Sequence, residues 1–281
     1  MCVPGVWGQE GRLFTTSRVL GANRFWASEG VEGSICLPTY DRLRDGDNPG
    51  RGEIASILVT AGPTLEFLDD VRYFANGSSG RMGYALAEAA LGAGHGVVLV
   101  SGPTELAAPA GAKLRSVTSA LEMQAAVDEA LAAEPVDVVL AVAAVADYRP
   151  ADRHLGKLPS GEESLTVELF PNPDILGSLG VRRSRGEFDA VLVGFALQSG
   201  DPDEILALGR EKLRRKNLDM IVVNHLSAMG ATDNEVTLVH ADGRTVALPR
   251  QDKADLAPAI VAAVMDILQT RKSDNEGGST R

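Results

Sequence analysis

The segment "FANGSSGRMG", residues 74–83, contains residue types that bind anions. Its glycines and serines at 77–80 would present backbone N–H groups and hydroxyls just before a helix beginning near Met82, and the positive end of a helix attracts negative charge. The glycines stand three residues apart, unlike the G-x-G-x-x-G of dinucleotide folds or the GxxxxGK[ST] of P-loops. Asn76 adds an amide donor and acceptor. The turn either binds an anion or merely connects a strand to a helix.

A second group of residues follows a predicted central strand. Ala143 and Ala144 are small enough for a flat ring to approach the backbone, and Asp147 follows them. A long polar loop then carries Lys157. A lysine on a mobile loop can close on developing negative charge, although most loop lysines are only solvated.

Two further lysines, Lys212 and Lys216, are spaced four apart and share one face near the end of a predicted helix. They would suit a triphosphate, or they merely offset the helix dipole. The four histidines are scattered without metal-binding spacing, and no nucleophile–base pair is evident. The pairs Asp69–Asp70 and Glu162–Glu163 are interpreted as solvated loop charge, so a protein nucleophile and a protein metal site are both disfavoured.

The elements that would position these residues alternate between apolar strands and helices, which predicts a doubly wound, Rossmann-like α/β fold with a parallel sheet covered on both faces. The alternating run 235–249 around Gly243 predicts a C-terminal antiparallel hairpin. Ligands of such sheets collect outside the carboxyl ends of the strands, where the candidate loops lie. The predicted strands are Ser56–Ala61, Gly96–Gly102, the start of Val136–Tyr148, Ser164–Phe170, Asp189–Leu197 and Asp219–His225, and the predicted helices are Gly83–Gly94, Ser119–Glu134, one with Pro173 in its first turn, Asp201–Lys216 and Ala254–Leu268.

Length and composition set the domain organisation. The 281 residues, 44% of them hydrophobic, suit one α/β domain, predicted here as residues 53–271. Residues 1–52 lack a sustained period and are interpreted as a poorly ordered or lineage-specific extension, and residues 272–281 as a disordered tail. The net charge of -11 disfavours a nucleic-acid-binding face.

The small number of cysteines and the lack of a long apolar run bear on the cellular compartment of the protein. The chain has 2 cysteines, Cys2 and Cys36, which do not suggest a disulfide framework. No apolar run is long enough to cross a bilayer, and residues 1–48 do not resemble a signal peptide. The sequence therefore predicts a cytoplasmic protein without a membrane partner.

Six motifs together resemble the phosphopantothenate-cysteine ligase (phosphopantothenoylcysteine synthetase) family of coenzyme A biosynthesis. The resemblance runs from about Ile57 to Leu268, with the motifs in the family's order. It implies a ligase without the flavoprotein decarboxylase domain that many bacteria fuse ahead of it. The motifs are "VTAGPT", "DVRYFANGSSGRMG", "AAVADYRP", "FPNPDIL", "VGFAL" and "KNLDMIVVN".

The resemblance implies a reaction in two halves. The carboxylate of 4′-phosphopantothenate would attack the α-phosphate of a nucleoside triphosphate, and the amine of L-cysteine would then displace the nucleotide. The motif "AVADYRP" resembles the bacterial branch of the family, which uses CTP, so CTP with Mg²⁺ carried by the nucleotide is expected and ATP is less favoured.

The resemblance also implies roles for individual residues. Asn76, Lys157 and Arg72 are the expected catalytic residues, and Arg72 matches an arginine that reaches the neighbouring subunit's site, which implies a homodimer. Lys157 matches the lysine of the family's mobile loop. The expected nucleotide-binding residues are Ala143, Ala144, Asp147, Asn172, Phe195, Lys212 and Lys216, and the expected substrate-binding residues are Ser78, Gly80, Gly83 and Asn224.

Four positions depart from the family pattern: Pro63 for a second glycine, Gly77 for an arginine, Pro159 where the loop usually has more lysines, and Gln198 for an acidic residue. These departures bear on the rate and on loop closure. A non-catalytic nucleotide-binding relative therefore stays an alternative. A nicotinamide-dependent reductase is a second alternative, disfavoured because the strand ending "VVLVSGPT" lacks a ribose-binding carboxylate.

Overall fold

The computed structural model describes residues 53–161, 164–198, 200–225 and 233–278. The predicted extension, residues 1–52, lies outside them. All described elements belong to one compact unit, Arg51–Arg281.

The centre of this unit is a sheet of 8 strands in the order β12-β11-β10-β9-β6-β1-β4-β5. The neighbouring strands β5, β4, β1, β6, β9 and β10 run parallel to one another. Strands β11 and β12 are antiparallel additions at one edge. This confirms the doubly wound α/β fold with a C-terminal hairpin. The strands are β1 (Ser56–Ala61), β4 (Gly96–Ser101), β5 (Lys113–Ser116), β6 (Val138–Ala141), β9 (Val191–Gln198), β10 (Met220–His225), β11 (Asp233–His240) and β12 (Thr245–Asp252).

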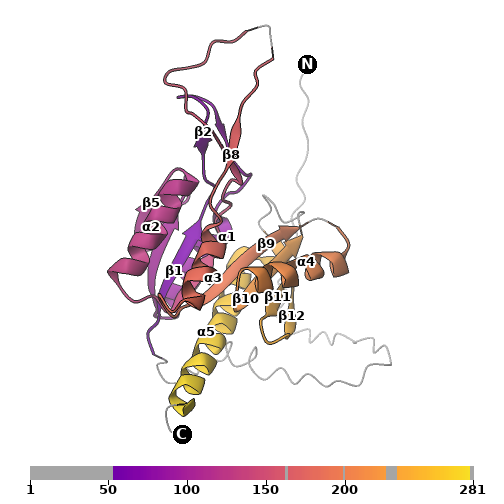
Figure 1. The fold of residues 1–281 in the computed structure, drawn as a ribbon. Helices are drawn as coiled ribbons and strands as arrows, with labels where there is room; N and C mark the ends of the chain where they lie inside the picture. The colour runs from indigo at the N-terminus through magenta and orange to yellow at the C-terminus, as the bar shows by residue number, and fades with distance from the viewer. Residues whose placement is uncertain (1–52, 162–163, 199, 226–232, 279–281) are drawn as a thin grey trace, which may run out of the picture. The chain divides into compact units, whose positions relative to one another are not determined.

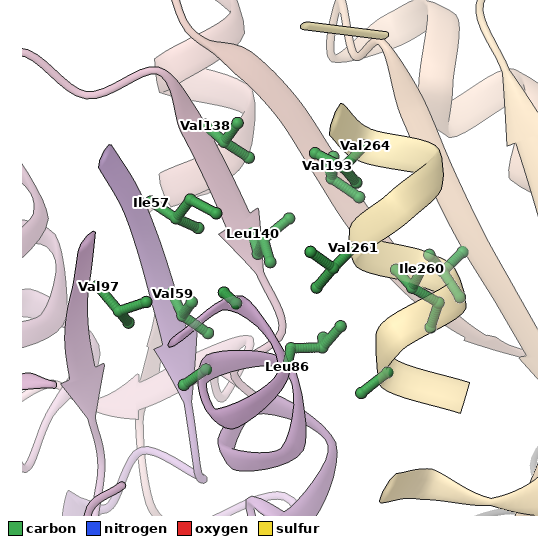
Figure 2. Close-up of a cluster of buried hydrophobic side chains, with 14 of the residues drawn as sticks. Ile57, Val59, Leu86, Val97, Val138, Leu140, Val193, Ile260, Val261 and Val264 are labelled. Atoms are coloured by element: carbon green, nitrogen blue, oxygen red, sulfur yellow. The ribbon is translucent and has the colours of Figure 1, made fainter. Parts of the chain in front are cut away.

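Helices cover both faces of the sheet (Figure 1). Alternate residues of one strand enter different cores: Ile57 of β1 belongs to the core that includes residues of α1 and α5, whereas Leu58 belongs to the core that includes residues of α2, α3 and α4. Figure 2 shows side chains of α1 and α5, including Leu86 and Val261, gathered over those of β1, β6 and β9. Burial on both faces explains the continuous apolar strands. The helices are α1 (Arg81–Gly92), α2 (Ala120–Ala133), α3 (Ile175–Ser184), α4 (Pro202–Arg215) and α5 (Lys253–Gly278).

The start of α3 and the end of α5 are among the helix boundaries that differ from the prediction. Helix α3 is capped by Asp174, whose carboxylate accepts the Gly177 N–H, so Pro173 precedes the cap instead of lying in the first turn. Helix α5 continues to Gly278. The described part of the predicted disordered tail is therefore helical. Lys272, at the start of this segment, forms ion pairs with Glu53 and Asp137.

Two small sheets lie outside the large one. One pairs β2 (Glu66–Phe67) with β3 (Tyr73–Phe74), and the other pairs β7 (Tyr148–Pro150) with β8 (Leu169–Pro171). Strands β2 and β7 are in contact, and Figure 1 shows β2 and β8 together beyond the helices. We call these four strands the arm. The predicted strand Ser164–Phe170 is shorter than expected because only its last residues pair with β7.

An ion-pair network at the amino-terminal ends of β9 and β10 should contribute strongly to the stability of the fold. The half-buried Asp219 accepts the Leu192 N–H at 2.7 Å and pairs with Arg183 and Arg271. Asp219→Ala would leave both arginines without this partner, and we expect it to lower the free energy of unfolding by about 3 kcal/mol. Denaturant unfolding measures this. The matched control is Asp189→Ala, which removes an exposed partner of Arg271 and should cost less than about 1 kcal/mol. Equal losses would contradict the prediction.

Candidate functional site

A cavity of about 840 Å³ lies where the strand order reverses, beyond the carboxyl ends of β1 and β6. This is where doubly wound sheets bind ligands, and the volume suits a small molecule. Most of the site residues predicted from the sequence line it. They are Asn76, Ser78, Gly80, Gly83, Ala143, Ala144, Asp147, Asn172, Phe195, Lys212, Lys216 and Asn224.

One end of the cavity is the turn that precedes α1. Gly80 is the N-cap residue with φ of 74°, a left-handed conformation that favours glycine, and a Cβ there would lie 2.7 Å from Cγ2 of Thr104. Glycine supplies no side-chain cap to the first N–H groups of the helix. Ser78 Oγ accepts the Gly80 N–H at 3.3 Å. The helix therefore begins with uncapped N–H groups beside the cavity, an arrangement that attracts anions.

Gly83 serves mainly for packing. A Cβ on it would lie 2.6 Å from the Cβ of Ala61 in β1 and 3.3 Å from the carbonyl oxygen of Thr60. Glycine thus allows α1 to pack closely against β1, and this close packing sets the position of the turn 76–80. Gly83 also lines the cavity, and its expected substrate contact stays a prediction.

The segment Ala143–Asp147 also lines the cavity, and two threonines position it, Thr60 in β1 and Thr64 just after it. Thr60 Oγ1 accepts the Val142 and Ala143 N–H groups at 3.1 and 3.2 Å, and Thr64 Oγ1 accepts the Ala146 N–H at 3.0 Å. The sequence reasoning missed both threonines. Their signal was a hydroxyl residue at each end of "TAGPT", at the point where the first strand ends.

Proline at position 63 fits this arrangement. Pro63 forms an isolated parallel bridge with Ala144. The hydrogen bonds of the bridge come from its neighbours, because Ala144 N–H donates to the Gly62 carbonyl at 2.9 Å and Thr64 N–H donates to the Ala144 carbonyl at 3.4 Å. The missing N–H of proline therefore removes no bond from the ladder.

Two asparagines hold the segment Ala143–Asp147 in place by donating to its backbone carbonyls. Asn76 donates its Nδ2–H to the Val145 carbonyl at 2.8 Å, which joins the turn before α1 to the segment after β6. Asn172 donates its Nδ2–H to the Ala146 carbonyl at 2.9 Å, and its Oδ1 accepts from Arg149 at 3.1 Å. Asn172 thus has both ends of its amide engaged within the protein, which gives it a positioning role here.

The other end of the cavity carries three cations from the end of α4: Lys212, Arg215 and Lys216. Burial lowers the pKa of the Lys212 ammonium, and the charges of Lys216 and Arg215 lower it further. Lys216 Nζ lies 2.7 Å from Oδ1 of Asp174. Burial alone would raise the pKa of Asp174, but the hydrogen bonds from Lys216 and the Gly177 N–H hold it below its ordinary value. An anion bound here would relieve the repulsion among the cations. Sequence reasoning missed Arg215, which directly precedes Lys216.

Two predicted residues, Arg72 and Lys157, do not line the cavity. Both lie at the arm, where Arg72 Nη2–H donates to the Leu158 carbonyl at 3.1 Å. The interpretation of Asp69 as a solvated charge is wrong, because its side chain is 0% exposed and bonded to both segments. Sequence reasoning missed this, because nothing near Asp69 in the chain shows which distant backbone groups approach it.

Among the residues that the structure describes, no three His, Cys, Asp or Glu side chains gather as a potential metal site. No helix of the described part has the length and apolarity needed to cross a membrane.

Comparisons with known proteins identify the family of the chain. Residues 53–268 match the family model of the DNA/pantothenate metabolism flavoprotein C-terminal domain. The coenzyme A biosynthesis bifunctional protein CoaBC of Vibrio vulnificus (strain CMCP6) is 40% identical over 219 residues, which cover 76% of this chain and 52% of that protein. The chain thus spans about half the length of the curated relatives that it matches.

Solved structures with a similar fold include the two that follow. The crystal structure of the C-terminal domain of a coenzyme A biosynthesis bifunctional protein CoaBC superposes with a TM-score of 0.65 at 38% identity, covering 77% of this chain and 96% of that one. A Cab2 mutant in complex with phosphopantothenate-cysteine has a TM-score of 0.64 at 18% identity, covering 79% of this chain and 89% of that one. At this identity the second likeness concerns the fold alone.

Proposed function

Because the chain belongs to the family of the DNA/pantothenate metabolism flavoprotein C-terminal domain, we propose that it joins 4′-phosphopantothenate to L-cysteine with CTP as the activating nucleotide. The names of its relatives support a step of coenzyme A biosynthesis. A mutant of a protein with the same fold is described in complex with phosphopantothenate-cysteine, the product of such a ligation.

One observation carries the proposal: a single cavity has an anion-attracting helix start at one end and three cations at the other. A ligase of this kind must bring together two anions, the acyl substrate and the nucleotide. The Ala143–Asp147 segment lies between the two ends, within hydrogen-bonding reach of Asn76. The cavity is therefore suited to hold the substrate carboxylate near Asn76 and the triphosphate near Lys212 and Lys216.

The proposed reaction has two halves. A carboxylate oxygen of 4′-phosphopantothenate attacks the α-phosphorus of CTP, the new O–P bond forms, and the bond to pyrophosphate breaks. The cysteine amine then attacks the acyl carbon, loses a proton, and expels CMP as the amide bond forms. Both steps develop negative charge, so the protein needs donors and cations more than a nucleophile.

The chain's own residues supply these groups. Lys212 and Lys216 would bind the triphosphate, which carries Mg²⁺, and the N–H groups at the start of α1 would bind an anionic group of the acyl substrate. Phe195 and the small residues Ala143 and Ala144 would receive the cytosine ring. Asn76 would hold the acyl carboxylate and, later, the acyl-cytidylate.

The arm supports the proposed homodimer. Large apolar side chains are exposed on its strands, including Tyr73 at 52%, Tyr148 at 55% and Phe170 at 47%. A surface of this kind gains stability when a second copy covers it. Arg72 lies in the turn that joins β2 to β3 and is suited to reach the neighbouring subunit's cavity.

The nucleotide preference has a direct test. In a pyrophosphate-release assay with phosphopantothenate, cysteine and Mg²⁺, we expect CTP to give a kcat/KM at least about tenfold above that of ATP, a difference of about 1.4 kcal/mol in transition-state binding. A faster reaction with ATP would overturn the choice of CTP but keep the ligase. No pyrophosphate with any nucleoside triphosphate would overturn the ligase and favour a non-catalytic relative.

The reductase alternative gains no support from the end of β4. There Ser101 Oγ–H donates to the Gly102 carbonyl at 2.8 Å and accepts from Tyr84 Oη at 3.1 Å. A Cβ on Gly102 would lie 1.7 Å from the Pro63 carbonyl oxygen. This strand end is filled by protein, where a dinucleotide fold would hold a ribose beside a carboxylate.

A further inference from the structure

Asp69 joins two parts of the arm. Its Oδ1 accepts the N–H groups of Val71 and Arg72 at 2.7 and 2.6 Å, and its Oδ2 accepts the Leu158 N–H at 3.1 Å. The Arg72 guanidinium lies 3.4 Å from Oδ2. Burial alone would raise the pKa of Asp69, but these hydrogen bonds and the charge of Arg72 hold it below its ordinary value. One buried carboxylate thus fastens the loop after β7 to the β2–β3 turn.

Asp70 makes the corresponding contacts one residue further on. Its Oδ2 accepts the Gly156 N–H at 2.7 Å, its Oδ1 accepts from Arg153 Nη2 at 2.9 Å, and its own N–H donates to the Gly156 carbonyl at 3.3 Å. Hydrogen bonds from the Gly156 N–H and the Arg153 guanidinium also hold the pKa of Asp70 below its ordinary value. The residues on both sides of Lys157 are therefore held on the β2–β3 hairpin.

These hydrogen bonds hold the segment around Lys157 beside Arg72. Arg72 donates to the carbonyl of Leu158, the residue that follows Lys157. Neither cation lines the cavity of its own chain. Bonds at Gly156 and Leu158 hold the residues on both sides of Lys157 on the hairpin that carries Arg72, so a movement of the arm as a whole would carry both cations together.

We propose that Lys157 serves the cavity of the other subunit, the same cavity that Arg72 reaches, and that Asp69 and Asp70 are positioning residues that keep the two cations together. This inference rests on the proposed ligase function and on its dimer. Each active site would then combine the cavity of one chain with the Arg72–Lys157 pair of the other. The developing charge at the α-phosphorus would thus be stabilised only after two chains have associated.

Heterodimers of defective chains test which subunit supplies Lys157. Two differently tagged chains are co-expressed and purified over both tags, and pyrophosphate release is measured. Asn76→Asp paired with Lys157→Gln should recover about half of the wild-type activity, since one of two symmetric sites is then intact. Arg72→Gln paired with Lys157→Gln should recover none, because each site lacks one of the two cations.

The reverse pattern would overturn the inference. If Lys157 acted within its own chain, the first pair would stay inactive and the second would recover activity. Failure to isolate any doubly tagged dimer would also overturn it. A wild-type dimer without ligase activity would instead remove the proposed function, so the two failures are distinguishable.

The positioning role of Asp69 has a separate test. Asp69→Asn keeps an oxygen for the Val71 and Arg72 N–H groups, but its amide nitrogen can no longer accept from Leu158. We expect kcat to fall about tenfold with an unchanged KM for CTP, since a displaced group loses orientation. Hydrogen exchange at the Leu158 amide should speed up in the same variant.

The matched control is Asp152→Asn, which removes the same charge from an exposed position of the same loop. It should leave both the rate and the exchange unchanged. Wild-type kcat and protected exchange in Asp69→Asn would contradict the role of Asp69. A fall in kcat with unchanged exchange would contradict it equally.

Discussion

Replacing Asn76 by aspartate is expected to lower kcat/KM for phosphopantothenate by about 100- to 1000-fold, the usual loss when a donor to a reacting oxygen is removed. Asn76 Nδ2–H donates to the Val145 carbonyl at 2.8 Å, and aspartate has no hydrogen to donate. The new carboxylate would repel both that carbonyl and the anionic substrate. Steady-state kinetics with each substrate varied measure the effect, and single-turnover analysis shows whether the acyl-nucleotide accumulates.

The matched control is Asn275→Asp, the same chemical change at an exposed position of α5. It should leave kcat/KM unchanged. Wild-type turnover by the Asn76→Asp enzyme would remove Asn76 from the proposed mechanism and leave the fold assignment untouched. A melting temperature close to that of the wild type would separate lost chemistry from lost folding.

The second large effect concerns Lys157→Gln, which keeps a long polar side chain but removes the charge. We expect the first half-reaction, measured as pyrophosphate release without cysteine, to slow by about 100-fold or more. The KM for CTP should change little, because a cation that acts mainly in the transition state contributes little to ground-state binding. The side chain of Lys157 is exposed, so its loss should not affect folding.

Lys113→Gln is the control for charge. Lys113 is an exposed residue of β5 that pairs with Glu134 at 2.7 Å, outside the cavity lining. It should retain the wild-type rate. If Lys157→Gln also retained that rate, the lysine would be only a solvated loop residue, the alternative that the sequence itself left open.

The fold was predictable because its local signals agree with its packing. Apolar runs such as that of β1 face helices on both sides, and the hairpin β11–β12 turns at Gly243, whose φ of 93° favours glycine. The short strands of the arm, including β2 and β3, escaped prediction because two-residue strands carry no measurable period. The end of α5 was missed because partners distant in the chain, Glu53 and Asp137, hold Lys272.

The candidate site was predictable in part for a topological reason. Parallel strands bring their carboxyl ends to one edge, so loops after different strands had to meet. This principle brought Asn76 and Asp147 to one cavity, whereas Lys212 reaches it from the last turn of α4. It does not say which side chains contact ligand and which hold the backbone, and so the support given by Thr60 and Thr64 was not foreseen.

The sequence by itself determined the doubly wound sheet, the edge at which its loops meet, and the residue types that the cavity contains. Only the tertiary structure decided that Gly83 packs against Ala61 and that Asp69 is a buried hydrogen-bond acceptor and not a solvated charge. It also decided that Arg72 donates to the carbonyl of the residue after Lys157. The reason is physical. Periodicity reports which face of an element is buried, whereas the partner of a buried carboxylate is a backbone group far away in the chain, which is known only when the elements are packed.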